Sequence, residues 1–521
     1  MDFFEPTQAF RENVMPVSVT VEGDVTQPER LTEVKPACVS FRNDDSAVFT
    51  GAGAGVVVDF GKELCGGIRL ITGGAAYKTA RFRLTLGESL VEACSVIGEK
   101  NATNDHAPRD FEIAVSGMGD VTYGMSGFRF AKLTLLSEEP VTVRSILAVN
   151  ILPRLEKEGW VRSNDVKLNQ IMDTAAYTLK LNLQNGCIWD GVKRDRLVWS
   201  GDLNPEILVA GHLYGDIPHI RNSLRFLREE TTAQQWINGI PTYSAWWVIN
   251  LCDHYRLTGN REFLTENLAY ARDVIRHFGS CVDEAGEMDF SDAWHFMAYF
   301  LDWPTANTPD APIGTAALLI YMAKKFLEIE ENPYCHVLIQ RLSRYLDMDC
   351  SFKQTRAFQI LAGRESAGQA AFLEKNGAEG FSTFMGYYIL KAYAMAGGKD
   401  PIGLIKDYYG GMLDRGATTF WEDFDLRWLE GSGRIDAMPE PGQTDIHGDN
   451  GAFCYIGFRH SLCHGWASGV LAFVIEDILG REGNTVNPCL CGLTEMEAKL
   501  PTQTGWLCAT ATPTQTITQI I

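Results

Sequence analysis

The densest group of polar side chains lies at residues 189–202, where the sequence reads WDGVKRDRLVWSGD. These fourteen residues contain three carboxylates, three cations and two tryptophans, and they lie between two predicted apolar helices. Indole rings pack on the apolar C–H face of a sugar, while Asp and Arg side chains hydrogen-bond its hydroxyl groups. The segment therefore indicates a sugar pocket, and an ion-pair network that pins a loop is the alternative from these residues alone.

A second group of aromatic and acidic residues lies at 417–425, which reads ATTFWEDFD and contains Glu422. Taken alone, this segment favours an amphipathic helix. Further aromatic residues occur at 243–247 and in Asp302-Trp303-Pro304. Each stretch alone is more typical of a core, but their repeated position near predicted helix starts favours a common rim around a pocket.

A third group contains His460 and His464, spaced i, i+4 before an apolar stretch. On a helix this spacing puts two imidazoles on one face, where they could bind zinc together with His447 or Cys454. No Glu follows His460, as it does in H-E-x-x-H. We therefore expect no metal, and we expect a histidine here to hydrogen-bond a ligand or the backbone.

The elements that carry these groups differ between the two halves of the chain. Segments 55–60, 67–72, 80–86 and 128–136 are short, rich in β-branched and aromatic residues, and separated by Gly, Asn and Asp. In segment 80–86, Phe82, Leu84 and Leu86 alternate with polar residues. This pattern predicts an antiparallel β-sandwich over residues 1–157.

From Asn164 onwards the apolar period changes from two to 3.6 residues, beginning with a stripe from Leu168 to Leu183. Ser163 or Asn164 is the expected N-cap of this helix. Comparable stripes recur as far as Leu479 and predict an all-α domain over residues 158–480, with a closed (α/α)6 barrel as a weaker inference. Residues 481–521 are Thr-rich and predict a short β-like tail that packs on an existing domain or is frayed.

Composition excludes several classes of partner. The 521 residues include 46 Lys and Arg against 66 Asp and Glu, a net charge of −20, whereas nucleic acids and anionic membranes select basic surfaces. No run of 18 apolar residues is present, so we expect no membrane span. The thirteen cysteines have no repeated spacing and residues 1–14 contain no apolar signal core, which favours free thiols and a cytoplasmic location. The oligomeric state is not predicted.

Three of these segments resemble the α-L-rhamnosidases of glycoside hydrolase family 78. Residues 190–202 resemble the family signature D-x-x-x-R-E-R-L-x-W-x-G-D. Residues 419–425 are similar to T-x-W-E-x-[WF]-D, and residues 461–464 are similar to S-x-x-H. The positions of the first motif that match are Asp190, Arg194, Arg196, Leu197, Trp199, Gly201 and Asp202.

The resemblance implies a β-sandwich followed by an (α/α)6 barrel that removes terminal non-reducing α-L-rhamnose from a carbohydrate substrate. It implies inversion without a metal or cofactor, with one carboxylic acid protonating the leaving oxygen and one carboxylate activating water. Asp195 falls on the general acid and Glu422 on the general base. The positions that fall on substrate-binding residues are Asp190, Arg194, Trp199, Asp202, Trp303 and His464.

The sequence departs from the family pattern in ways that leave other functions open. Asp195 replaces Glu, which sets its carboxyl group about 1 Å back, and misplacement of that order can cost about 10²-fold in rate. The flanking Arg194 and Arg196 favour an ionised carboxylate, which opposes a general acid unless burial compensates. The stretch 422–464 is longer than expected, and most of a C-terminal sandwich is missing. A rhamnosyl-uronate lyase and a sugar-binding protein without activity are the alternatives.

Overall fold

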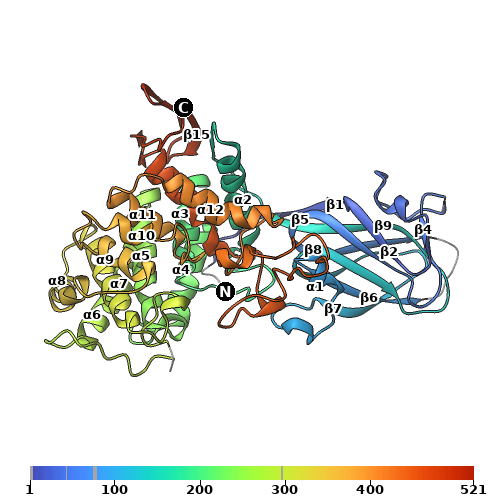
Figure 1. Ribbon diagram of the computed structural model, residues 1–521, viewed down its shortest axis with the longest axis horizontal. Helices are drawn as coiled ribbons and strands as arrows, with labels where there is room; N and C mark the ends of the chain where they lie inside the picture. Colours follow the sequence, from blue (N-terminus) through green and yellow to red (C-terminus); the bar gives the residue numbers. More distant parts are fainter. Residues whose placement is uncertain (1–3, 43, 74–78, 295–296) are drawn as a thin grey trace.

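The chain forms a β-rich N-terminal part, a helical part and a small C-terminal sheet. The computed structural model describes residues 4–42, 44–73, 79–294 and 297–521. Figure 1 shows the N-terminal strands and the helices side by side along the long axis of the molecule, with the C-terminal strands at one edge of the helical part.

The N-terminal part is one antiparallel sheet in which β5 and β9 are long central strands. β5 pairs with β8 along most of its length, with β2 at Gly55–Asp59, and with β9 at Gly66–Gly73. The sheet contains β1 (Ala9–Val14), β2 (Ser18–Glu22), β3 (Val25–Thr26), β4 (Ala47–Phe49), β5 (Gly55–Gly73), β6 (Ala80–Gly87), β7 (Asp110–Val115), β8 (Asp120–Leu135) and β9 (Val141–Pro153).

A single apolar core lies inside this sheet. Phe82 and Leu84 of β6 are buried in it, while Arg81 on the opposite face is exposed, as the alternation predicts. Phe60 and Phe128 from β5 and β8 meet edge to face with their ring centroids 5.9 Å apart. The predicted antiparallel β structure is thus present, as one continuous hydrogen-bonded sheet around one core.

The helical part begins at α2 (Val166–Asn182), and the predicted stripe from Leu168 to Leu179 is its buried face. Its N-cap is Asp165, whose side chain accepts the Leu168 N–H at 2.9 Å, so the predicted cap at Ser163 or Asn164 is wrong by one or two residues. The following helices are α3 (Leu203–Leu213), α4 (Pro218–Glu230), α5 (Pro241–Thr258), α6 (Arg261–Cys281), α7 (Asp310–Leu327), α8 (Pro333–Leu342), α9 (Lys353–Leu361), α10 (Ala370–Leu373), α11 (Gly386–Met395), α12 (Pro401–Asp414) and α13 (Val470–Phe473).

Two predicted helices take other forms. Residues 417–425 contain no helix, because their backbone groups bond to other segments of the chain. The stretch predicted as one helix at 462–479 is a 3₁₀-helix η8 (Gly465–Gly469), a single α turn (α13) and a π turn η9 (Val474–Ile478). Polar residues interleaved with aromatic ones therefore mark a loop here, where spacing alone favoured an amphipathic helix.

The C-terminal tail packs on the helical part. β10 (Trp160–Ser163) pairs with β15 (Met496–Pro501), which continues through β16 (Trp506–Thr512) to β17 (Gln515–Ile520) in a four-stranded antiparallel sheet. Two short hairpins are β11 (Leu183–Gln184) with β12 (Cys187–Ile188) and β13 (Arg481–Glu482) with β14 (Thr485–Val486). Among the described residues, no helix combines the length and apolar character that a bilayer crossing requires.

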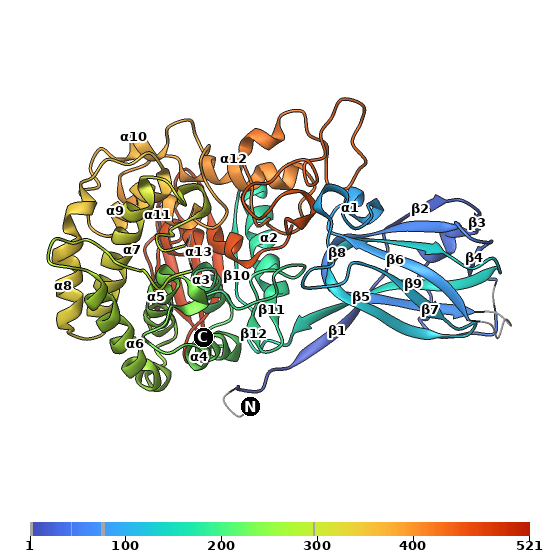
Figure 2. The same cartoon turned by 90° about the horizontal axis from the view of Figure 1, so that it is seen from below.

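The long polar stretch between Glu422 and His464 joins the helical part to the β part. In both views its loops lie against α1 (Leu90–Cys94), the short helix that follows β6 (Figures 1 and 2). Lys100 of the β part pairs with Asp445 at 3.1 Å and with Asp449 at 2.8 Å. This stretch therefore contributes to the junction between the two parts.

Candidate active site

Three loops from distant parts of the sequence meet at one point beside the helix ends. Residues 190–202 lie between β12 and α3, residues 417–425 follow α12, and residues 460–464 precede η8. The Gly465 N–H donates to the Asp190 carbonyl at 2.6 Å, His464 N–H to Phe420 at 3.0 Å, and Glu422 N–H to Ser461 at 2.9 Å. These backbone hydrogen bonds fix the three loops relative to one another.

A cavity of about 210 Å³ opens where the three loops meet. All eight site residues expected from the sequence line it, although they span more than half of the chain. They are Asp190, Arg194, Asp195, Trp199, Asp202, Trp303, Glu422 and His464. The structure therefore brings the whole predicted set together in one pocket, in which acids, one guanidinium, one imidazole and indole rings face the same space.

Arg194 connects the two predicted catalytic carboxylates. Its Nη1 donates to Asp195 Oδ1 at 2.9 Å, and its Nη2 donates to Glu422 Oε1 at 2.6 Å. Arg194 and Glu422 are each 3% exposed, so the guanidinium acts in a medium of low polarity. The carboxylates are thus separated by no more than two hydrogen bonds and the width of one guanidinium, and the Arg194 side chain sets their spacing.

Asp195 has the environment of a group that holds a proton. Burial raises the pKa of Asp195 above its ordinary value against the opposing charge of Arg194, and the neighbouring Asp190 and Glu422 raise it further. The expectation that Arg196 also favours the ionised form is wrong. Arg196 turns to the β part, where its Nη1 donates to the Met125 carbonyl at 3.2 Å.

His464 stands among three carboxylates on the other side of the pocket. Its Nε2 is 3.5 Å from Glu422 Oε1, 3.6 Å from Asp190 Oδ2 and 3.8 Å from Asp202 Oδ2. Burial alone would lower the pKa of His464, but the neighbouring carboxyl groups of Asp190, Glu422 and Asp202 raise it above the ordinary value. The imidazole therefore tends to carry a positive charge, which neutralises part of the acidic cluster.

Asp190 and Asp202 differ although both are buried. Burial would raise the pKa of Asp190, but His464 and the N–H groups of Asp195 and Leu197 hold it below its ordinary value. Burial raises the pKa of Asp202 to about 8, against the charge of His464. Asp190 is therefore a structural anion that orients its own loop, while Asp202 can offer a neutral O–H donor near pH 7.

Tyr243 supports Asp202 through a hydroxyl that donates to Asp202 Oδ1 at 3.1 Å. The ring reaches this position because residue 201 is glycine: a Cβ there would lie 2.6 Å from the Tyr243 ring. Glycine at position 201, which matches the signature, is thus needed because any side chain there would clash with the Tyr243 ring. The same ring meets Trp199 edge to face at 5.9 Å between centroids.

Aromatic rings form the opposite wall of the pocket. Trp303, in the 3₁₀-helix η4 (Trp303–Thr305), stacks on Phe453 with ring centroids 5.4 Å apart and planes 27° apart. Tyr455 meets Trp303 edge to face at 5.6 Å and lies under the Arg194 guanidinium at 5.2 Å. This wall offers flat apolar faces opposite the carboxylates, as sugar recognition requires.

Behind the catalytic loop lies a buried charge cluster that involves both parts of the chain. Lys193 Nζ is 2.9 Å from Glu88 Oε2 and 3.1 Å from Glu92 Oε1, and it also donates to the carbonyls of Phe458 and His460. Burial raises the pKa of Glu88 to about 7 against the charge of Lys193. Glu88, which directly follows β6, is thus a buried partner of the loop of residues 190–202.

Two groups of the described residues have a spacing that could hold a metal ion: Glu88, Glu92 and His447, and Asp190, Asp202 and His464. Lys193 already supplies a cation to the first group, and the His464 imidazole lies among the carboxylates of the second. The zinc site weighed for His460 and His464 does not form, because residues 460–464 are not helical. His460 Nε2 instead accepts the Asp423 N–H at 2.8 Å, a backbone hydrogen bond of the expected kind.

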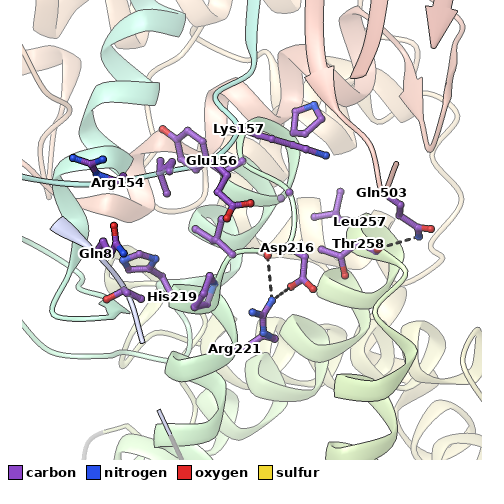
Figure 3. A pocket seen from close by; sticks show the side chains of 18 of the residues that line it. Gln8, Arg154, Glu156, Lys157, Asp216, His219, Arg221, Leu257, Thr258 and Gln503 are labelled. Atoms are coloured by element: carbon purple, nitrogen blue, oxygen red, sulfur yellow. Dashed lines mark hydrogen bonds and ion pairs between the residues drawn. The ribbon is translucent and has the colours of Figure 1, made fainter. Parts of the chain in front are cut away.

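A larger cavity of about 580 Å³ lies elsewhere, between the linker after β9, the start of α4 and the C-terminal sheet (Figure 3). Two of its titratable side chains, Asp216 and Arg221, pair with each other, and Asp216 also accepts from His254 behind the lining at 2.9 Å. Gln503 donates to the Thr258 carbonyl at 2.9 Å across the same space. This cavity lacks the paired carboxylates and aromatic wall of the smaller one, so the chemistry is assigned to the smaller cavity.

Sequence reasoning missed three residues near the reacting groups. Tyr455 and Arg459 line the pocket from the long polar stretch, and His106 reaches it from the β part, with Nε2 3.3 Å from Asp195 Oδ1. None of them lies in a motif or on a periodic face. The signal that could have pointed to these residues was the concentration of polar residues in segments to which the periodicity assigned neither a helix nor a strand.

The order of the elements and the carboxylate pocket define the fold of the family 78 α-L-rhamnosidases. No protein-family model and no curated protein sequence matches the chain, so the similarity is structural. A rhamnosidase of Bacillus sp. GL1 superimposes with a TM-score of 0.69 at 18% identity, over 93% of this chain and 53% of that one. The comparison confirms a mixed fold of antiparallel β-sheets and helices similar to that of the α-L-rhamnosidases, and the closed (α/α)6 barrel stays a prediction.

Two further solved structures contain the sugar. The Klebsiella oxytoca rhamnosidase with rhamnose bound matches with a TM-score of 0.68 at 20% identity, over 90% of this chain and 96% of that one. The Streptomyces avermitilis α-L-rhamnosidase complexed with L-rhamnose matches with a TM-score of 0.68 at 17% identity, over 97% and 48%. The chain thus spans about half the length of the Bacillus and Streptomyces proteins and nearly all of the Klebsiella protein.

Proposed function

We propose that this protein is a glycosidase that removes terminal, non-reducing α-L-rhamnose from a glycoside or oligosaccharide with inversion at the anomeric carbon. The helices α2–α13 would form the (α/α)6 barrel of such an enzyme, with the pocket at the end where the three loops meet. The substrate is a neutral sugar on a larger aglycone, and no cofactor is proposed.

One observation carries the proposal: a single buried guanidinium holds Asp195 and Glu422 on its two sides, at 2.9 Å and 2.6 Å. In an inverting enzyme the two carboxyl groups are about 6.5–9.5 Å apart, because a water molecule must fit between the base and the sugar. The Arg194 bridge supports a separation wider than a direct contact. Two carboxyl groups in one aromatic pocket are the chemistry that glycoside hydrolysis needs.

The roles follow from the environments of the two acids. Asp195 carries the raised pKa and donates its proton to the glycosidic oxygen as the C1–O bond breaks. Glu422 takes a proton from the water that attacks C1 from the opposite face. Burial has compensated for the neighbouring cation at Asp195, which removes the electrostatic objection to an Asp at this position.

The test compares wild type, Asp195→Asn and Glu422→Gln on an aryl α-L-rhamnoside, with the first-formed anomer followed by NMR. We expect β-L-rhamnose as the first product, and a loss of at least about 10²-fold in kcat for each variant. A Glu422→Gln variant with the full rate would refute the assignment. An ultraviolet-absorbing unsaturated product would identify a lyase, and rhamnose binding without turnover would identify a sugar-binding protein.

A further inference from the structure

A loop of the β part reaches the candidate acid of the helical part. Residues 102–109 follow the 3₁₀-helix η2 (Glu99–Asn101) and precede β7, and they place His106 Nε2 3.3 Å from Asp195 Oδ1. Among the titratable side chains of the described β part, His106 is the one paired with a predicted catalytic carboxylate. The proposed catalytic machinery is therefore not confined to the helical part.

This loop is held in place on both sides of the histidine. Asn104 Oδ1 accepts the N–H groups of Arg109 at 2.9 Å and of Asp110 at 3.1 Å, which closes the loop at its base. Asp105 forms an ion pair with Arg459, a residue that lines the pocket. His106 itself has a φ of 65°, a conformation that costs most side chains energy and persists only when the surroundings fix it.

The position of His106 matches a need of the proposed reaction. After each turnover Asp195 is left as a carboxylate and must regain a proton before the next cleavage. Only 19% of the Asp195 side chain is exposed, whereas 29% of the His106 side chain is exposed, so water reaches the imidazole more readily than the acid. His106 thus lies between solvent and an acid that solvent reaches poorly.

We infer that His106 is the relay through which Asp195 is reprotonated, an inference that rests on the proposed glycosidase function. Asp195 gives its proton to the departing glycosidic oxygen, and the protonated imidazole then transfers one proton from Nε2 to the Asp195 carboxylate. The neutral imidazole takes a proton from water, while Glu422 releases to water the proton that it removed from the nucleophile. The charge and the proton count return to their starting values.

The charged groups around His106 fit this exchange. Asp195 faces it from the loop of residues 190–202, and Arg194 Nη1 donates to the same Asp195 Oδ1 that His106 Nε2 contacts. On the loop side, Asp105 is already paired with Arg459. The nearest acceptor for the imidazolium proton is therefore Asp195, which gives that proton to the glycosidic oxygen at the next cleavage.

The test uses two variants that tolerate the positive φ at residue 106. A substitution that disrupted the loop would also lower the rate of hydrolysis, and this loss could not be told from loss of the relay. Asn often adopts this left-handed conformation and Gly adopts it freely. For a rhamnosyl disaccharide, which needs acid assistance, we expect His106→Asn to lower kcat by about tenfold or more with KM changed less than about twofold. The aglycone of a dinitrophenyl rhamnoside leaves as an anion and needs no proton from Asp195. The same variant should therefore hydrolyse this substrate at the wild-type rate.

Chemical rescue separates a proton relay from a structural role. His106→Gly leaves space beside Asp195, so added imidazole should restore most of its rate on the disaccharide, with a pH dependence that follows imidazolium. His336→Asn is the matched control, because His336 is exposed and pairs only with Glu331. Equal rates of His106→Asn and wild type on the disaccharide, or a slow His106→Gly variant that imidazole does not accelerate, would overturn the relay. A wild-type protein that hydrolyses no rhamnoside would overturn the proposed function and the relay together.

Discussion

Arg194 and Glu422 lie 228 residues apart in the chain and form a buried ion pair with an Nη2–Oε1 distance of 2.6 Å. Because the other arm of the guanidinium holds Asp195, one side chain sets the position of both candidate catalytic groups. A planar, forked cation can bridge two carboxylates in a way that an ammonium group cannot. The pair therefore couples the geometry of the acid to that of the base.

Replacing Arg194 tests this coupling. Arg194→Lys keeps the charge but cannot reach both acids, so we expect kcat on a rhamnoside to fall by about 10²-fold. Arg194→Met leaves Glu422 buried without its cation and should lower the free energy of unfolding by about 3–5 kcal/mol, measured with urea. The double variant Arg194→Met with Glu422→Gln should lose less than the sum of the single losses. Strict additivity would show that the pair does not matter.

Asp202 should leave a signature in the pH dependence of stability. Its folded pKa is about 8 against an ordinary value of 3.8, so between these values the folded protein binds the extra proton. The stabilisation from this group is complete below about pH 4 and is lost as the pH rises through about 8. Asp202→Asn keeps a neutral side chain at every pH. Urea unfolding at several pH values should therefore show wild type losing stability relative to Asp202→Asn as pH rises, and parallel curves would contradict the assigned shift.

Lys193 should be important for stability rather than for substrate binding. Lys193→Met removes the cation that pairs with Glu88 and leaves Glu92 with Arg109, whose Nε is 3.8 Å away, which should cost about 3–5 kcal/mol at pH 7 in urea unfolding. The loss should be smaller at pH 5, because Glu88, with its pKa raised to about 7, then holds a proton. Lys62→Met is a matched control whose ammonium is 40% exposed and should change stability by less than about 1 kcal/mol. Equal losses in the two variants would contradict the buried cluster.

Trp303 should contribute to binding of the sugar or its aglycone. Trp303→Ala removes the ring that Phe453 and Tyr455 pack against, and we expect KM for an aryl rhamnoside to rise by about tenfold with a smaller change in kcat. Phe453→Ala removes only the 45% exposed outer ring of the stack and should raise KM less. A larger effect of Phe453→Ala would place the main contact at the rim instead of in the pocket.

The fold could be predicted from the sequence because buried apolar residues recur with the period of the strand or helix that carries them. Phe82 and Leu84 alternate with polar neighbours on a strand, and Leu168 to Leu179 form the inner face of α2. The cap at Asp165 was missed because three neighbouring polar residues were chemically equivalent candidates. The loop at 417–425 was missed because its buried aromatic residues Phe420, Trp421 and Phe424 have helical spacing although the backbone forms no helix.

The local sequence could predict only those parts of the candidate site whose residues are neighbours in the chain. Asp190 to Asp202 are close in sequence and share one loop, but their meeting with Glu422 and His464 depends on backbone bonds such as that from Gly465 to Asp190. No local pattern contains that information, so the resemblance had to supply it. His106 comes from the other part of the chain, which neither the local pattern nor the motifs connected to this pocket. The orientation of the Arg196 side chain toward the β part likewise depends on tertiary contacts that the local sequence does not contain.

The Lys193 cluster also determines how the protein can be divided. Residues 154–159 look like a simple linker, yet the rear of the catalytic loop is neutralised by Glu88 and Glu92 from the far side of that linker. A helical part produced alone would keep the buried ammonium of Lys193 without its counter-ions. We therefore expect the two parts to unfold as one cooperative unit, and a proteolytic cut at the linker to leave a nicked, assembled molecule instead of two independent modules.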